Sequence, residues 1–186
     1  MNVIEAIQSR RSIKRFEHRP PTREQIESLL SMAVLAPNHR NTEPWRFYVL
    51  GPDARHAYGL ALGERRARKV EDPDKAREVR DRTAAEHRAV PCMIAVAMII
   101  SDNPEIREED YAATMMGVQN IALAAVELGL GTHIRTGAVM DDPAARGAAG
   151  VAAGERIVAL VNVGTPKEVP PGRTRAPAVT HAAWIP

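Results

Sequence analysis

Arg10-Arg11-Ser12-Ile13-Lys14-Arg15-Phe16 is the stretch from which we infer the fold, together with three segments further along the chain. It follows residues 2–10, which have the polar cap and the apolar spacing of a short helix. Arginine offers a planar fork of donors, serine a hydroxyl and lysine a point charge, so the stretch suits a phosphate or a polarised heterocycle. A basic run alone is more often a solvated helix end, and the other segments are therefore needed.

The second segment is a polar loop, Ala36-Pro37-Asn38-His39-Arg40-Asn41-Thr42-Glu43-Pro44-Trp45. The third is a glycine-rich turn from Gly129 to Gly137, and the fourth is the pair Arg173 and Arg175 near the C-terminus. Each is weak evidence by itself, because glycines commonly end helices and arginines in a proline-rich tail are often solvated. Their occurrence together, in this order, is specific.

In order and spacing, the four segments resemble the nitroreductase-like family of FMN-dependent flavoproteins, from Asn2 to about Thr180. The resemblance implies a single domain over residues 1–186 with an α+β fold. In that fold a small central mixed sheet is flanked by helices, and a long buried core helix lies at a dimer interface. The resemblance also implies a homodimer that binds FMN between its subunits.

The composition is that of one globular domain, because 45% of the 186 residues are hydrophobic and 26% are charged. A formal net charge of +2 and the lack of a nucleic-acid-binding motif disfavour a nucleic-acid binder. Cys92 is the only cysteine, which excludes an internal disulfide and a multi-cysteine metal site. The apolar run Cys92–Ile100 is too short for a membrane span and no secretion signal is visible, so we expect a cytoplasmic protein.

Apolar spacing and caps predict interleaved helices and strands, which is compatible with an α+β or an α/β class. Thr22 and Gln25 have the spacing of a capping box. The predicted strands 93–100 and 157–163 are apolar throughout, which predicts burial on both faces. The predicted helices cover about residues 2–10, 22–36, 53–63, 74–87, 111–128 and 143–149, and a further strand covers residues 46–50.

The resemblance assigns the basic segment to FMN. Arg10 and Ser12 would hold the phosphate and the ribityl side, and Arg11 would contribute to the same pocket. Lys14 would approach the pyrimidine edge of the flavin ring, where negative charge gathers on two-electron reduction, so a cation there favours the reduced state. The alternative for Lys14 is a solvated side chain.

By the same resemblance, the second segment reaches the flavin of the other subunit. Asn38, His39 and Asn41 occupy its polar positions, and Leu35 at the end of the preceding helix belongs to the same group. Asparagine can offer both donors and acceptors to the amide edge of the ring. His39 and Glu43 depart from the usual residues of the motif, so the local hydrogen bonding differs.

The glycine-rich turn would run across one flavin face and direct backbone N–H groups of Ile134, Arg135 and Thr136 toward N5, the hydride-accepting atom. Arg173 and Arg175 would complete the phosphate site. No strand–GxGxxG–helix unit exists, so NAD(P)H would stack on the flavin as a passing reductant. No side chain is expected to be catalytic by itself, because the cofactor carries the chemistry, and no metal is expected.

These expectations describe an FMN-dependent NAD(P)H oxidoreductase that reduces nitroaromatic, quinone or similar electron-poor acceptors by ping-pong hydride transfer through N5. The alternatives are a related enzyme of oxygen-dependent flavin fragmentation or reductive dehalogenation, and a non-catalytic flavin-binding protein. Residues 53–89, which are rich in charge, are expected to form a mobile lid or a solvated helix over the substrate. The proline-rich tail from Thr165 either wraps a neighbour or is disordered.

Overall fold

Four strands form one sheet in the order β1–β2–β4–β3, and all three neighbouring pairs are antiparallel. The computed structural model describes residues 1–186. The sheet is antiparallel throughout, which corrects the mixed sheet implied by the resemblance. The one parallel pairing is an isolated bridge between Ser12 and Thr132, outside the four strands. The strands are β1 (Trp45–Leu50), β2 (Cys92–Ile99), β3 (Gly131–Arg135) and β4 (Glu155–Gly164).

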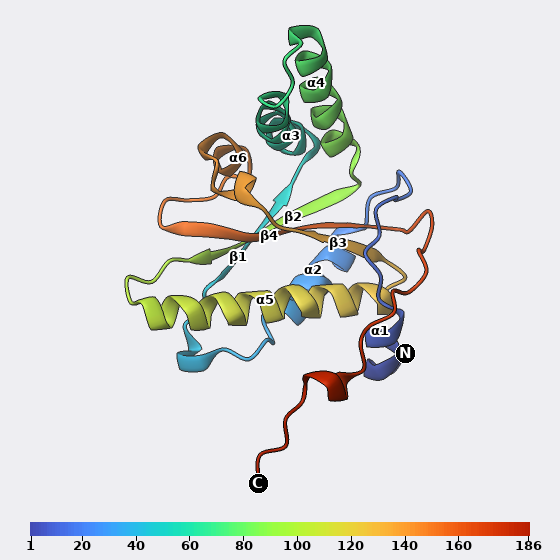
Figure 1. The fold of residues 1–186 in the computed structure, drawn as a ribbon, viewed down its shortest axis with the longest axis vertical. Helices are drawn as coiled ribbons and strands as arrows, with labels where there is room; N and C mark the ends of the chain where they lie inside the picture. Colours follow the sequence, from blue (N-terminus) through green and yellow to red (C-terminus); the bar gives the residue numbers. More distant parts are fainter.

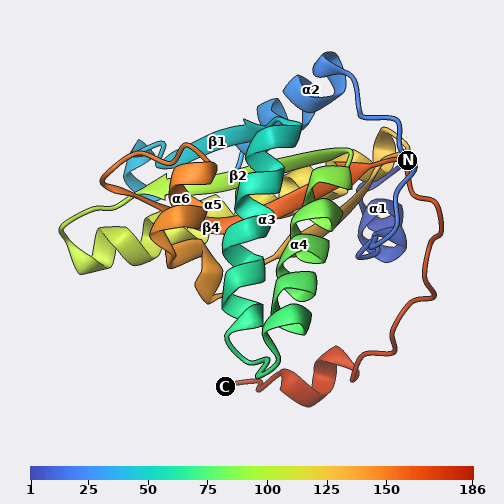
Figure 2. The same cartoon turned by 90° about the horizontal axis from the view of Figure 1, so that it is seen from above.

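Helices cover both faces of the sheet, with α2 and α5 on one face and α3, α4 and α6 on the other (Figure 1). Helix α1 packs against α5 near the C-terminal end of that helix, as Figures 1 and 2 show from two directions. The helices are α1 (Val3–Ser9), α2 (Arg23–Ala33), α3 (Pro52–Ala67), α4 (Pro73–Ala89), α5 (Pro104–Glu127) and α6 (Pro143–Ala148), with short 3-10 turns η1 (His39–Asn41), η2 (Ala138–Asp141) and η3 (Ala178–His181).

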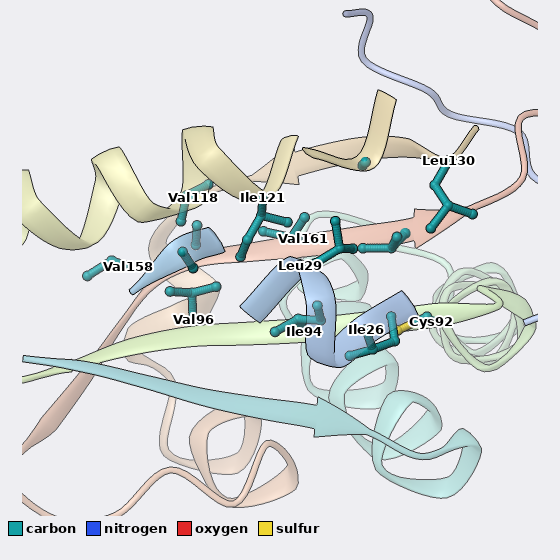
Figure 3. Packing of buried hydrophobic residues seen from close by; sticks show 14 of the residues in the cluster. Ile26, Leu29, Cys92, Ile94, Val96, Val118, Ile121, Leu130, Val158 and Val161 are labelled. Atoms are coloured by element: carbon teal, nitrogen blue, oxygen red, sulfur yellow. The ribbon is translucent and has the colours of Figure 1, made fainter. Parts of the chain in front are cut away.

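The core is divided by the sheet, and β2 contributes to both halves. Ile94 and Val96 pack under α2 and α5 (Figure 3). Met93 and Ala95 belong to the other half of the core, with residues of α3 and α6. Side chains on both faces of β2 are therefore buried, which confirms the prediction for this strand. Cys92 lies in the same strand, and burial raises the pKa of its thiol to about 11, so it is a structural residue.

Two helices are longer than the sequence predicts. Helix α5 begins at Pro104 rather than near Tyr111, because Asn103 caps it and Pro104 occupies its first turn. Its first turns are rich in charged residues, of which Glu105 and Glu108 are exposed, so they lack the apolar period on which the prediction relied. Helix α3 continues past Gly63 to Ala67, and α4 ends at Ala89, so the connection between them is only residues 68–72.

Gly59 and Gly63 allow α3 and α4 to pack closely. A Cβ atom on Gly59 would lie 2.8 Å from the Cα of Ala84, and one on Gly63 would lie 2.7 Å from the backbone oxygen of Arg80. Real side chains do not approach backbone this closely, so both positions require glycine. The expected lid over residues 53–89 is thus a tightly packed helical hairpin that projects from the sheet (Figure 2).

We expect Gly63→Ala to lower the free energy of unfolding by up to about 2 kcal/mol. The helix gains about 1 kcal/mol from the exchange, but overpacking against Arg80 costs about 1–3 kcal/mol. Gly147 in α6 has open space around it, so Gly147→Ala should raise stability by up to about 1 kcal/mol. Urea unfolding of both variants measures the difference, and equal effects would remove the close-packing explanation.

The glycine-rich segment 129–137 is a strand for most of its length, which corrects the predicted turn. Gly129 ends α5 with φ of 69°, and β3 then pairs with β4 from Gly131 to Arg135. A Cβ atom on Gly131 would collide with the side chain of Ile13, so the glycine admits the basic segment alongside the strand. The backbone N–H of Ile13 donates to the oxygen of Thr132 at 2.8 Å.

The residues after β4 lie against the other side of the basic segment. The N–H of Glu17 donates to Thr165 at 2.9 Å, and the N–H of Lys167 donates to Arg15 at 3.0 Å. The tail then passes close to Arg11, whose Nη2 would lie 2.7 Å from a Cβ atom on Gly172. Only the end of the tail leaves the body of the molecule (Figure 1), and Trp184 is 90% exposed. None of the helices has the length and continuous apolar character needed to span a bilayer.

Candidate functional site

A cavity of about 600 Å³ lies where the basic segment, β3 and the start of the tail meet. Ile13 is 3% exposed and anchors the segment, so its neighbours Ser12 and Lys14 turn outward from the core. The cavity is lined by the predicted residues Arg10, Arg11, Ser12, Lys14, Arg173 and Arg175, and by His133 and Glu168. The structure therefore brings the first and fourth predicted segments together.

The cavity is strongly cationic. Five of its side chains are arginine or lysine, whereas Glu168 is its one carboxylate and forms an ion pair at 3.6 Å with Arg15. Arg11 is held by its Nη1, which donates to the backbone oxygens of Gln8 at 2.6 Å and Arg10 at 2.9 Å. Several guanidinium groups without carboxylate partners are the arrangement that a dianionic phosphate requires.

His133 is a cavity residue that the sequence interpretation missed. Burial, followed by the charges of Arg135 and Lys14, lowers the pKa of His133, so its imidazole is neutral near pH 7. The missed signal is the strand period: His133 and Arg135 are two residues apart on β3 and therefore lie on one face, while Ile134 packs against the core.

The predicted residues of the second segment do not line this cavity. Leu35 is 69% exposed, and the loop that follows it packs on the N-terminal part of α5. Since α5 has 24 residues, its ends are about 36 Å apart. The cavity is lined by residues at and after the end of α1, and α1 packs near the opposite, C-terminal end of α5. Within one chain, Asn38, His39 and Asn41 are therefore far from the cationic cavity.

The loop is held in a strained shape by contacts of its own and by α5. Three of its residues have left-handed φ angles: Arg40 at 68°, Asn41 at 49° and Glu43 at 45°. The Asn38 side chain accepts from the N–H of Glu43 at 2.8 Å. Such strain persists only where surrounding contacts enforce it, and it is concentrated at functional sites.

Glu109 of α5 is the main external contact of the loop. Its carboxylate lies 2.9 Å from Nδ1 of His39 and accepts from Nε of Arg40 at 3.0 Å, and these two hydrogen bonds lower the pKa of Glu109. Next to it, Thr42 donates to Asp110. The sequence interpretation missed Glu109, because only the fold brings it to the loop.

Removal of the Glu109 carboxylate should release the loop. We expect Glu109→Gln to increase amide hydrogen exchange of residues 38–43 by about tenfold, because it removes charge from two hydrogen bonds that oppose backbone strain of about 1–3 kcal/mol. Mass-spectrometric exchange measures this change. Glu108→Gln is the control, since Glu108 is exposed on the same helix; an equal increase in that variant would contradict the role of Glu109.

The side chains of the third predicted segment do not share one site. Ile134 packs against the core, and the Arg135 side chain turns to α4, where its Nη1 donates to Nε2 of His87 at 2.7 Å. His87 is 3% exposed, and burial is the main cause that lowers its pKa. Thr136 follows the strand and is exposed.

The lowered histidine pKa values predict a loss of stability in mild acid. The unfolded chain protonates His87 and His133 near pH 6.5, whereas the folded chain resists protonation, so the unfolded state binds more protons below that pH. Stability should fall from pH 7 to pH 5, by up to about 1.4 kcal/mol per pH unit for each histidine. Urea unfolding at several pH values tests this, and His87→Gln should flatten the profile.

The model of the protein family described as "Nitroreductase family" matches residues 7–165, which include the basic segment, the strained loop and β3. The chain belongs to the nitroreductase family. A relative from Bacillus subtilis (strain 168), "Putative NAD(P)H nitroreductase YfhC", is 33% identical over 171 residues, or 92% of this chain and 88% of that protein. The family assignment makes this nitroreductase an oxidoreductase and confirms the resemblance found in the sequence.

Solved structures share its fold. A nitroreductase-like family protein from Bacillus cereus has a TM-score of 0.86 at 26% identity, over 100% of this chain and 96% of that chain. The FMN and NADPH-dependent nitroreductase NfnB from Sphigopyxis sp. strain HMH has a TM-score of 0.75 at 17% identity, over 100% of both chains. At that identity the second likeness shows the fold alone. The α+β, nitroreductase-like class predicted from the sequence is confirmed.

Proposed function

We propose that this nitroreductase is an FMN-dependent NAD(P)H oxidoreductase that reduces nitroaromatic, quinone or similar electron-poor acceptors. The observation that carries the proposal is the convergence of Arg10, Ser12, Lys14 and Arg173 on one cavity of about 600 Å³, from segments more than 150 residues apart. That volume is within the usual range for cofactor sites. NfnB, with the same fold, is FMN- and NADPH-dependent by name.

The donor set of the cavity fits FMN. Arg10, Arg173 and Arg175 would hold the phosphate together with the Ser12 hydroxyl, because charge-assisted hydrogen bonds to phosphate oxygens are strong. Lys14 would place a positive charge at the pyrimidine edge, and the backbone of residues 134–136 would lie beside the ring. Bound FMN would supply two-electron chemistry, and the residues supply binding, orientation and charge.

The same proposal includes a homodimer, because the strained loop is remote from the cavity of its own chain. A second copy would bring Leu35, Asn38, His39 and Asn41 to the flavin. Exposed apolar residues support an interface on this side of the molecule, where α1, α5 and the tail lie (Figure 1). They include Val3 at 69%, Ile4 at 67%, Met116 at 41% and Trp184 at 90% exposed.

One cavity would serve both substrates in turn. The chain has no separate dinucleotide-binding unit, so the nicotinamide would have to leave before an acceptor enters the same place. The protein would thus follow a ping-pong order. In this order the residues of the cavity would hold the flavin ring and leave room for the nicotinamide and the acceptor in turn.

Purification tests the proposal directly. We expect a yellow, dimeric protein that binds FMN, is bleached by NADH or NADPH without oxygen, and regains colour with a nitroaromatic or a quinone. A colourless protein that ignores added FMN would refute it. Slow bleaching that no acceptor reverses would favour a flavin-binding protein, and chromatographic loss of flavin after exposure of the reduced protein to oxygen would favour flavin fragmentation.

A further inference from the structure

Arg135 and His87 form a hydrogen-bonded pair that the proposed flavin site does not use. Arg135 Nη1 donates to His87 Nε2 at 2.7 Å, and His87 Nδ1 lies 2.7 Å from the backbone oxygen of Thr83. A carbonyl oxygen can only accept, so Nδ1 carries the proton and Nε2 is the acceptor. His87 is therefore neutral, and Tyr58 packs beside it with ring centroids 6.2 Å apart.

The Arg135 charge has no carboxylate partner. None of the 13 ion pairs of the chain includes Arg135, although its side chain is half-buried. Burial, followed by the positive charge of Arg66, lowers the pKa of Arg135, and Glu86 is the one carboxylate that acts on it. A cation withdrawn from water without a counterion is costly, so this position favours an incoming anion.

The free edge of the guanidinium is open to such an anion. Nη1 is committed to His87, whereas Nε and Nη2 make no hydrogen bond within the chain. Every buried side-chain nitrogen or oxygen without a hydrogen bond belongs to another residue. The unbonded Nε and Nη2 atoms of Arg135 are therefore accessible to solvent. Two adjacent N–H donors in a plane match the two oxygens of a carboxylate or a phosphate.

Arg135 does not line the cavity itself, but its neighbour on the same strand face does. Arg135 shares a strand face with His133, which lines the cavity, and both Arg135 and Lys14 act electrostatically on His133. Positive charge gathers here, because Arg66 of α3 acts on Arg135, and Arg135 and Lys14 act on His133; Glu86 is the one carboxylate that opposes it at Arg135. The proposed phosphate ligands of the cavity belong to the basic segment and the tail, and not to β3.

We propose that the Arg135 side chain, positioned by His87, binds the anionic oxygens of the molecule that enters against the flavin. This inference rests on the proposed function and specifies its substrate class: the preferred partner carries a carboxylate or a phosphate. The anion belongs either to the acceptor, as an aromatic carboxylate, or to the dinucleotide, as its phosphate. In this proposal the side chain of Arg135 binds the anion, and its backbone lies beside the flavin ring.

Benzoate binding tests the anion site without turnover. We expect benzoate to bind the purified protein, with or without FMN, and its affinity to fall about tenfold to a hundredfold in Arg135→Gln, as expected for a lost charge-assisted hydrogen bond. Arg88→Gln is the matched control, because Arg88 is an exposed arginine of α4 that pairs with Asp53. Equal affinity in wild type and Arg135→Gln would overturn the inference, whatever the flavin content of the protein.

Half-reactions of the FMN-loaded protein identify the source of the anion. The acceptor pair is 4-nitrobenzoate and its neutral methyl ester, and the reductant pair is NADPH and neutral N-benzyl-1,4-dihydronicotinamide. A selective loss for 4-nitrobenzoate in Arg135→Gln assigns the anion to the acceptor, and a selective loss for NADPH assigns it to the dinucleotide. Equal losses for charged and neutral partners would overturn the inference.

Two further readouts separate the roles of the residues. FMN affinity of Arg135→Gln is compared with wild type, and a loss as large as that of benzoate affinity would reassign its side chain to the cofactor and overturn the inference while leaving the proposed function intact. His87→Ala should reproduce the loss of benzoate affinity. His87→Gln, whose side-chain oxygen can still accept from Arg135, should restore most of it; failure of this rescue would contradict the positioning role.

Discussion

FMN affinity should fall by at least about a hundredfold when Arg10 and Arg173 are both replaced by glutamine. Each arginine lines the cationic cavity, and each contact with a phosphate is expected to contribute about 1.5–3 kcal/mol as a charge-assisted hydrogen bond. Two such losses multiply, because about 1.4 kcal/mol corresponds to a factor of ten. Quenching of FMN fluorescence on titration of the flavin-free protein measures the dissociation constant.

Two controls make this result specific. Arg23→Gln with Arg82→Gln removes the same charge from exposed positions that pair with Glu27 and Glu78, so FMN affinity should not change. Riboflavin lacks the phosphate, so its affinity should be nearly equal in wild type and in the cavity variant. If riboflavin and FMN lose affinity equally, the two arginines do not bind the phosphate, and the orientation proposed for the cofactor is wrong.

Ile121→Ala should lower the free energy of unfolding by about 2–5 kcal/mol, which is the range for buried isoleucine replaced by alanine. Ile121 of α5 is 0% exposed and packs in one cluster with Leu29 of α2 and Val161 of β4 (Figure 3). The cavity left by its side chain cannot close easily, because the sheet and two helices surround it. Equilibrium unfolding in urea measures the loss.

A smaller truncation of the same side chain tests whether the loss of stability depends on the size of the void that is left. Ile121→Val removes one methylene group and should cost about 0.5–1.5 kcal/mol. Because a dimer adds a concentration-dependent contribution to stability, both variants are compared with wild type at equal protein concentration. Similar losses for the two variants would mean that the site relaxes around the deletion, which contradicts the tight packing of this half of the core.

Local features of the fold were predictable from the sequence because they depend on near neighbours. Asn2 with Glu5, and Thr22 with Gln25, form the capping boxes of α1 and α2, and each needs only residues three positions apart. The continuous apolar run at β2 predicts a buried strand for the same reason. The missed first turns of α5 had a local signal as well, Asn103 followed by Pro104, which apolar spacing alone does not detect.

The candidate site was predictable only in part. The residue types of the basic segment and of Arg173 and Arg175 indicate an anion site, but their meeting depends on Gly131 admitting Ile13 beside β3 and on Thr165 pairing with Glu17. The partners of the functional residues are also set by the fold. Glu109 is about 70 positions from the loop that it holds, and His87 is 48 positions from Arg135.

By itself, the sequence determined the types of chemical group, the capped helices, the buried strands and the family resemblance that orders them. Tertiary structure alone decided which of these groups share a cavity, that the strained loop lies at the far end of α5, and that Arg135 turns to a neutral histidine without a counterion. The physical reason is range: caps and apolar periods act over a few residues. Close approach and the pairing of charges are set where distant segments pack together, and no short stretch of sequence specifies them.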